Sequence, residues 1–199
     1  MKLEIKYNKT VLREFQTKLK MRVKALPTLK NKEAALRAMV FDTRKRMEEA
    51  SLVLRELLGE MEGWKSLWNE FDFSLLQVRE VRVSRNKIAG ILIPSYEGID
   101  TTIQEFPLTL RPDWFSEGVP VLQHVLEAMA KEKVLNHRLR LLEQARKKAT
   151  QKVNLYEKVQ IPALESAIRQ IKRYLEDEDN LSKASQKLLK TKMQKILEL

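Results

Sequence analysis

The sequence has no cysteine and few residues that interrupt helices, with five glycines and six prolines among 199 residues. The absence of cysteine excludes disulfide bonds, thiolate metal ligands and thiol nucleophiles. Seven of the eleven glycines and prolines lie between Gly90 and Pro120. Because the rest of the chain has few breakers and 43% of all residues are hydrophobic, we expect long helices on both sides of a distinct central segment.

Long hydrophobic runs are also absent. The longest apolar run, residues 88–93, spans six residues before it ends at Pro94, whereas a helix that crosses a bilayer needs about 20. The first nine residues are mostly polar and contain no apolar segment of the kind found in signal peptides. We therefore expect a soluble protein with no direct membrane span.

Apolar residues recur with alternating three- and four-residue spacing through the N-terminal third, and fifteen of the eighteen positions in this stripe are apolar. A period of 3.5 residues is typical of helices that coil around a partner helix. The positions are Leu12, Phe15, Leu19, Arg22, Leu26, Leu29, Glu33, Leu36, Val40, Thr43, Met47, Ala50, Leu54, Leu57, Met61, Trp64, Trp68 and Phe71.

The C-terminal third carries a second stripe, from Leu122 to Leu175. Its phase shifts near Ile161-Pro162, which predicts a bent or locally unwound turn, and Pro27 predicts a kink or short break in the first helix. Two long helices separated by an insert predict a mainly α fold. We expect a long antiparallel two-helix coiled coil of the N- and C-terminal segments, with a small insert that contains a β-hairpin.

The central segment has the residue pattern of β-strands. Residues 80–83 alternate polar and apolar side chains, residues 84–87 form a plausible turn, and residues 88–93 are rich in isoleucine before Pro94. This pattern predicts a hairpin whose strand residues include Val81, Val83, Ile88, Ile91 and Ile93, and a mostly irregular chain from Ser95 to Pro120. The expected division is an N-terminal long helix (1–75), the insert (76–118) and a C-terminal long helix with a charged tail (119–199).

Charge is distributed unevenly along the chain. The formal net charge is +11, with +8 in residues 1–32, −5 in residues 33–130 and +8 in residues 131–199. In an antiparallel pair of helices the two basic segments meet at one end. A basic surplus favours an anionic partner, and a nucleic-acid-binding coiled coil is one alternative. Base stacking would need aromatic residues among the basic clusters, but Phe15 and Tyr156 lie on the apolar stripes, so we expect no nucleic-acid partner.

No motif for catalysis or cofactor binding is present. The sequence lacks a phosphate-binding loop, a dinucleotide fingerprint and a nucleophile elbow. His124 and His137 are thirteen residues apart, too far along a helix to share a metal ion. The sequence therefore predicts no catalytic residue, no metal site and no cofactor.

One C-terminal motif resembles a known family, the D subunits of the V-type (vacuolar and archaeal-type) ATPases and ATP synthases. That family shows a T-Q-K-V-N core followed by I-P-x-L-E in its C-terminal helix. The matching residues here are Thr150, Gln151, Lys152, Val153, Asn154, Ile161, Pro162, Leu164 and Glu165. A weaker match begins at Asn8, and the resemblance covers both ends of the chain.

The resemblance implies a central rotor shaft, the central stalk, that carries torque between the catalytic hexamer of A and B subunits and the ion-translocating membrane ring. It implies a non-catalytic protein that binds the F subunit and a funnel-shaped coupling protein, in the cytoplasm and peripheral to the membrane through the rotary complex. In some members a short hairpin in the insert affects hydrolysis. A prefoldin-like chaperone, with exposed apolar tips, is the other alternative. The residues expected to face the hexamer are Lys18, Lys20, Arg22, Lys187, Lys190 and Lys192.

Overall fold

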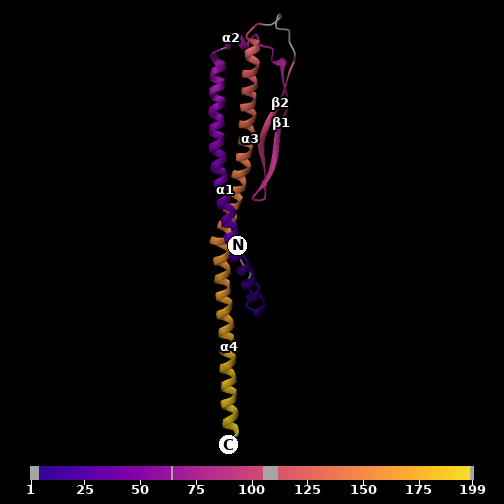
Figure 1. The fold of residues 1–199 in the computed structure, drawn as a ribbon. Coiled ribbons are helices and arrows are strands. Elements are labelled where there is room, and N and C mark those ends of the chain that lie inside the picture. Colours follow the sequence, from indigo (N-terminus) through magenta and orange to yellow (C-terminus); the bar gives the residue numbers. More distant parts are fainter. Residues whose placement is uncertain (1–4, 64, 105–111, 198–199) are drawn as a thin grey trace. The chain divides into compact units, whose positions relative to one another are not determined.

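The computed structural model describes residues 5–63, 65–104 and 112–197, with the backbone alone for residues 195–197. Most of these residues are helical (Figure 1). The elements in chain order are α1 (Lys9–Gly63), α2 (Lys65–Trp68), the 3₁₀ turn η1 (Phe73–Leu75), β1 (Leu76–Ile88), β2 (Ile91–Ile103), α3 (Phe115–Asn154), the π-helical turn η3 (Leu155–Gln160) and α4 (Ile161–Leu197). The mainly α fold with a two-stranded hairpin is confirmed.

The chain forms two structural units, which are described separately. The terminal unit consists of residues 1–31 and 149–199, and the hairpin unit consists of residues 32–148. Helices α1 and α3 each contribute residues to both units.

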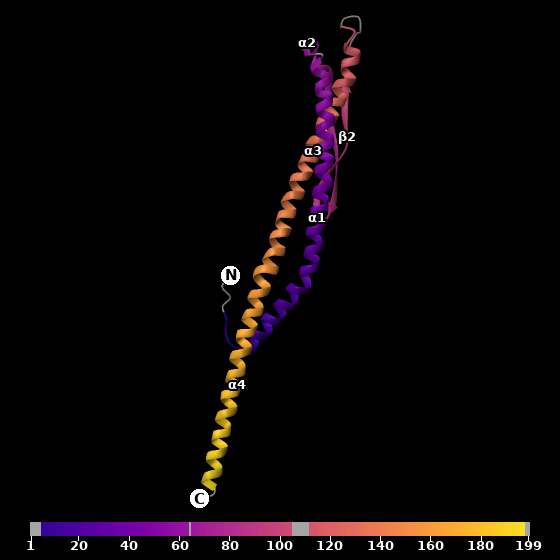
Figure 2. The same cartoon turned by 90° about the vertical axis from the view of Figure 1, so that its left-hand side faces the viewer.

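In the terminal unit, the first part of α1 runs antiparallel to η3 and α4 (Figures 1 and 2). Asn8 caps α1, because its Oδ1 accepts a 2.7 Å hydrogen bond from the backbone N–H of Val11. The core of this unit joins one aromatic side chain of α1 to four side chains of α4: Phe15, Leu164, Ala167, Ile168 and Ile171. Near the start of the chain, the rings of Tyr7 and Tyr174 lie 4.9 Å apart between centroids.

In the hairpin unit, the later part of α1 pairs with α3. Arg44 Nη2 lies 2.6 Å from Glu143 Oε1, and Ser51 Oγ donates a 2.9 Å hydrogen bond to Glu132 Oε1. Because the residue numbers rise along α1 as they fall along α3, the two helices are antiparallel. The predicted antiparallel pairing is therefore present inside each unit.

The predicted apolar stripe agrees closely with the burial of α1. Every described position of the stripe, including Arg22 and Glu33, is buried or half-buried; Trp64 lies outside the described residues.

Helix α1 is continuous through Pro27, so the short break expected there is absent. Leu26 and Leu29 on either side of Pro27 are half-buried on the stripe, and this packing holds the helix despite the lost hydrogen bond. In the second stripe, Met129 is an exception, since it is exposed.

The end of the hairpin unit that carries α2 is closed by aromatic side chains. Phe71 stacks at 5.0 Å from Phe115 and at 5.7 Å from Trp114, and Trp68 lies 5.5 Å from Trp114 between ring centroids. A Cβ at Gly118 would lie 2.9 Å from the indole of Trp114, so glycine lets α3 approach this cluster.

The hairpin exists, but its turn lies elsewhere than predicted. Ile88 pairs with Ile91, and the two connecting residues, Ala89 and Gly90, have φ values of 52° and 80°. Such two-residue turns match the twist of the strands, and glycine favours positive φ. The prediction of a turn at residues 84–87 was therefore wrong, since the stronger turn signal, Gly90, lies three residues beyond Lys87.

The irregular chain expected from Ser95 to Pro120 was also wrong in part. Strand β2 continues through Pro94 to Ile103, because the outer side of a two-stranded sheet needs no N–H from proline. At the other end, α3 begins at Phe115 and includes Pro120, which removes only one intrahelical hydrogen bond. Residues 105–111 lie outside the described residues.

Candidate functional site

The family-like motif forms an irregular joint in the terminal unit. Residues 150–154 make the last turn of α3, and η3 follows as a π-helical turn in which the N–H of Ile161 donates to the carbonyl of Tyr156, five residues back. Pro162 has no N–H to donate at the next position. The π-helical turn accommodates the one residue by which the two halves of the C-terminal stripe are out of phase. The predicted irregular turn is confirmed.

Helix α1 contacts η3 through three polar pairs. Arg22 Nε donates a 2.6 Å hydrogen bond to Gln160 Oε1, and its guanidinium carbon lies 6.0 Å from the ring centroid of Tyr156. Two turns further along α1, Lys30 Nζ lies 2.6 Å from Glu157 Oε1. Arg22, expected to face the hexamer, is therefore half-buried against η3 with partners inside its own chain.

The motif presents two faces. Leu164 is buried, and Thr150, Val153 and Ile161 are half-buried. The other motif residues are exposed: Gln151, Lys152, Asn154, Pro162 and Glu165. One face thus packs in the terminal unit, and the other remains on its surface.

The remaining basic candidates lie on the surface of the terminal unit. Lys20, Lys187, Lys190 and Lys192 are exposed. Lys18 is exposed as well, but it forms an ion pair with Glu14 and lies 5.8 Å from the Phe15 ring centroid. The sequence of the terminal unit holds nineteen Lys and Arg against nine Asp and Glu, so this unit carries +10 of the +11 net charge.

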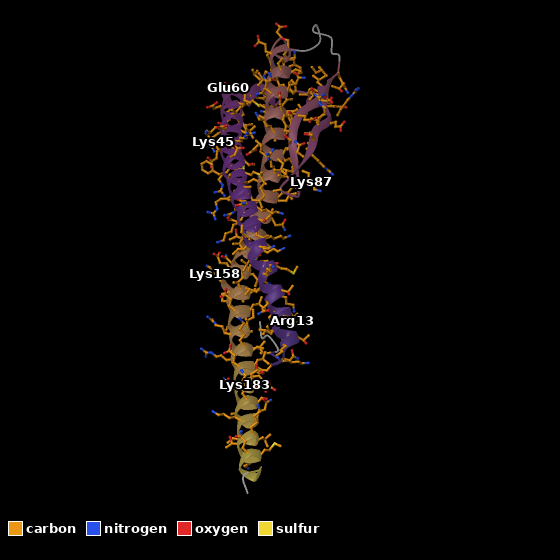
Figure 3. All side chains as sticks on the ribbon, turned by 60° about the horizontal axis from the view of Figure 1, so that its bottom comes forward. Arg13, Lys45, Glu60, Lys87, Lys158 and Lys183 are labelled. Atoms are coloured by element: carbon orange, nitrogen blue, oxygen red, sulfur yellow. The ribbon has the colours of Figure 1, made fainter. Side chains whose placement is uncertain are left out.

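Helix α4 extends well beyond the point where α1 begins (Figure 1), and Lys183 in Figure 3 marks this stretch. We call residues 176–194 the overhang; all of its side chains are exposed. Four of them are large and apolar, with between 62% and 70% of their surface accessible: Leu181, Leu188, Leu189 and Met193. Their helical spacing is visible in the sequence, which carries an amphipathic stretch from Leu181 to Leu199. Such a surface is typical of a helix that binds a partner.

The hairpin packs on the helices of its own unit and leaves cavities beside it. Ile93 is buried, Val81, Ile88 and Ile91 are half-buried, and Val83 is exposed. Two cavities, of about 720 and 890 Å³, are lined by residues of the hairpin and of the helices, and both have Pro94 in their walls.

Tyr96 of β2 lines the smaller cavity. Burial raises the pKa of its phenol, the nearby Glu127 carboxylate raises it further, and Arg82 acts in the opposite direction. The phenol is therefore protonated and a hydrogen-bond donor at neutral pH. No sequence motif pointed to this cavity, because its walls come from three separate segments.

The described residues contain no cluster of three or more histidine, aspartate or glutamate side chains that could hold a metal ion. His124 and His137 are both exposed. Among the same residues, no helix is both long and apolar enough to cross a bilayer.

The fold and its surfaces define a mainly helical protein in which long helices pair antiparallel, with a β-hairpin between them along the chain. A family model that describes the D subunit of ATP synthase matches residues 11–191. A V-type ATP synthase D subunit from Borreliella burgdorferi is 30% identical, covering 96% of this chain and 95% of that protein. Proteins of the same name from Chlamydia muridarum and Chlamydia trachomatis are 30% and 27% identical, each with 98% of both chains covered. The chain therefore belongs to the ATP synthase D-subunit family, and it is one of the proteins that make up a V-type ATP synthase.

Proposed function

We propose that this chain is the central rotor shaft of its complex, a non-catalytic component that carries torque between the A/B catalytic hexamer and the membrane ion-translocating ring. The observation that supports this role most strongly is the family match over residues 11–191, a span that includes the apolar stripe of α1. A shaft that transmits torque must resist twisting along its length, and a buried stripe joins the helices at each turn.

Polar contacts between the helices support the same role. The terminal unit has the contacts of Arg22 and Lys30 with η3, and the hairpin unit has the pairs Arg44–Glu143 and Ser51–Glu132. Contacts of this kind oppose sliding of one helix along the other, because each joins a defined residue on one helix to a defined residue on its partner.

We place the hexamer-binding surface on the overhang of α4 and the adjacent face of α1. The overhang offers exposed leucines for an apolar socket, and Lys20, Lys187, Lys190 and Lys192 offer positive charge for an acidic rim. Lysine suits a moving contact, because its ammonium group makes weakly directional interactions. Lys18 is retained as a weaker candidate, since Glu14 already pairs with it.

The other partners follow from this assignment. The F subunit and the funnel-shaped coupling protein bind the parts of the chain that lie outside the hexamer. The protein is then peripheral to the membrane and on its cytoplasmic side, held there by the rotary complex.

Reconstitution of the A/B hexamer with and without the chain tests the assignment. We expect the chain to bind the hexamer and to change its ATPase rate. The triple variant Lys20→Glu, Lys187→Glu, Lys190→Glu should bind about tenfold more weakly at low salt. A matched variant, Lys45→Glu, Lys65→Glu, Lys133→Glu, makes the same charge change in the hairpin unit. An equal loss of hexamer binding in both variants would contradict the proposed surface. If the hexamer neither binds the chain nor changes its ATPase rate when the chain is added, the proposed function is contradicted.

The chaperone alternative also predicts exposed apolar residues, and the overhang has them. It further predicts that the isolated chain suppresses aggregation of an unfolded protein such as reduced insulin. We expect no suppression of aggregation at an equimolar concentration of the chain. The leucines of the overhang lie on a single helix, which does not enclose an unfolded protein between two apolar surfaces.

A further inference from the structure

The smaller cavity beside the hairpin, of about 720 Å³, lies among three elements of the hairpin unit. Ala50 and Leu57 of α1, Pro94 of β2 and Leu135 of α3 contribute apolar walls. Its volume falls in the range of small-molecule sites, which are mostly apolar with a few polar groups that orient the ligand.

Two hydrogen-bond donors in the cavity walls lack acceptors. The hydroxyl of Tyr96 and the Nε of Arg138 are both buried, and neither has a hydrogen-bond partner within the described part of the chain. Buried polar groups in proteins are almost always paired, so each of these two donors needs an acceptor, which a ligand or a solvent molecule in the cavity can supply.

The charges of the walls indicate the sign of that occupant. The charged residues that line the cavity are Arg46, Lys131 and Arg138 and the two carboxylates Glu49 and Glu127. Two of these groups have partners on their own helix: Arg46 lies 3.0 Å from Asp42, and Glu49 lies 4.0 Å from Lys45. The remaining charged groups are Lys131, Arg138 and Glu127. Their net charge is positive, which favours an occupant with a single negative charge.

We propose that this cavity binds a small amphipathic carboxylate, with its apolar body between the helices and the hairpin. The carboxylate accepts hydrogen bonds from the hydroxyl of Tyr96 and from Nε of Arg138. Since the occupant touches α1, β2 and α3 together, it holds the hairpin against the helix pair. The site is independent of the rotor function, because it needs only the hairpin unit of a free chain.

Calorimetric titration of the full chain with octanoate tests the proposal, with octanol as the uncharged probe of similar shape. We expect octanoate to bind at least roughly tenfold more tightly than octanol, because only the carboxylate pairs with both donors. Tyr96→Phe and Arg138→Leu should each weaken octanoate binding by about tenfold. Tyr174→Phe and Arg169→Leu, the same changes on the exposed surface of α4, should leave it unchanged.

A space-filling variant separates binding in the cavity from binding elsewhere. Ala128 is half-buried in the cavity wall, and Ala128→Leu should abolish octanoate binding while circular dichroism shows the helices intact. The proposal is overturned if octanoate binds no better than octanol, if Ala128→Leu binds it normally, or if the Tyr96 and Arg138 variants behave like their controls. Normal binding by Ala128→Leu would mean that octanoate binds outside the cavity, and either of the other results would mean that its carboxylate does not pair with the two donors.

Discussion

Arg22 Nε donates a 2.6 Å hydrogen bond to Oε1 of Gln160, the residue that ends the π-helical turn η3. Arg22 occupies a position on the apolar stripe of α1, and it lies opposite the π-helical turn η3. Arg22→Ala removes the hydrogen bond, the contact with Tyr156 and the packing of the side-chain stem. We expect a loss of about 1–3 kcal/mol in unfolding free energy, measured by urea denaturation. Lys20→Ala, an exposed neighbour, is the control and should change stability by less than about 0.5 kcal/mol.

The π-helical turn provides a test of helical phase. Deleting Val159 removes the extra residue, and Pro162→Ala in the same variant restores the backbone N–H that a regular helix uses. The two halves of the stripe then stay in phase, so the double variant should unfold within about 1 kcal/mol of the parent.

Deleting exposed Arg169 is the matched control for that variant. This deletion rotates the rest of α4 by about 100° and turns Ile171 away from α1, at a cost of about 3 kcal/mol or more. Urea denaturation measures both variants. If the two deletions cost the same, the π-helical turn does not set the phase of packing.

Thr43 lies on the stripe with only 1% of its surface exposed, and its hydroxyl has no partner among the described residues. Thr43→Val keeps the shape and the branched Cβ but removes the unpaired hydroxyl, so we expect a gain of about 1 kcal/mol in unfolding free energy. Thr17→Val is the control, because the hydroxyl of Thr17 is exposed and donates to the carbonyl of Arg13. A gain at both positions would mean that valine is favoured for some reason other than the unpaired group.

The turn of the hairpin contains an alanine at positive φ, since Ala89 has φ of 52°. Ala89→Asn places a residue that tolerates this conformation before Gly90, and we expect the hairpin to gain about 0.5–1 kcal/mol. Amide hydrogen exchange of β1 and β2 measures the change directly. Ala89→Val, a branched residue at the same position, should accelerate exchange; slower exchange in this variant would contradict the turn geometry.

Periodicity alone predicted the helical part of the fold, because a stripe of period 3.5 can be buried only by a parallel or antiparallel partner helix. Even the exceptions on the stripe, Arg22, Glu33 and Thr43, are buried or half-buried. The phase shift near Pro162 also located the irregular turn correctly, since a one-residue slip between two stripes must be absorbed locally.

Other features depend on contacts that no local pattern encodes. The hairpin turn was misplaced because residues 84–87 are polar, whereas the turn is set by Gly90 and the pairing of Ile88 with Ile91. The contact of Arg22 with Gln160, which lies 138 residues away, could not be predicted from the local sequence, where only the charge of Arg22 was visible. The cavity at Tyr96 was missed for the same reason, since three distant segments form its walls.

The rotor assignment is tested most directly by watching the chain move inside the hexamer. Because the sequence contains no cysteine, Lys87→Cys near the hairpin turn provides a unique thiol to which a bead can be attached; Lys87 is labelled in Figure 3. The A/B hexamer is fixed to a surface, and ATP is added. We predict that the bead turns continuously in one direction and stops when ATP is removed. A bead that remains bound and stationary while the hexamer hydrolyses ATP would contradict the rotor function.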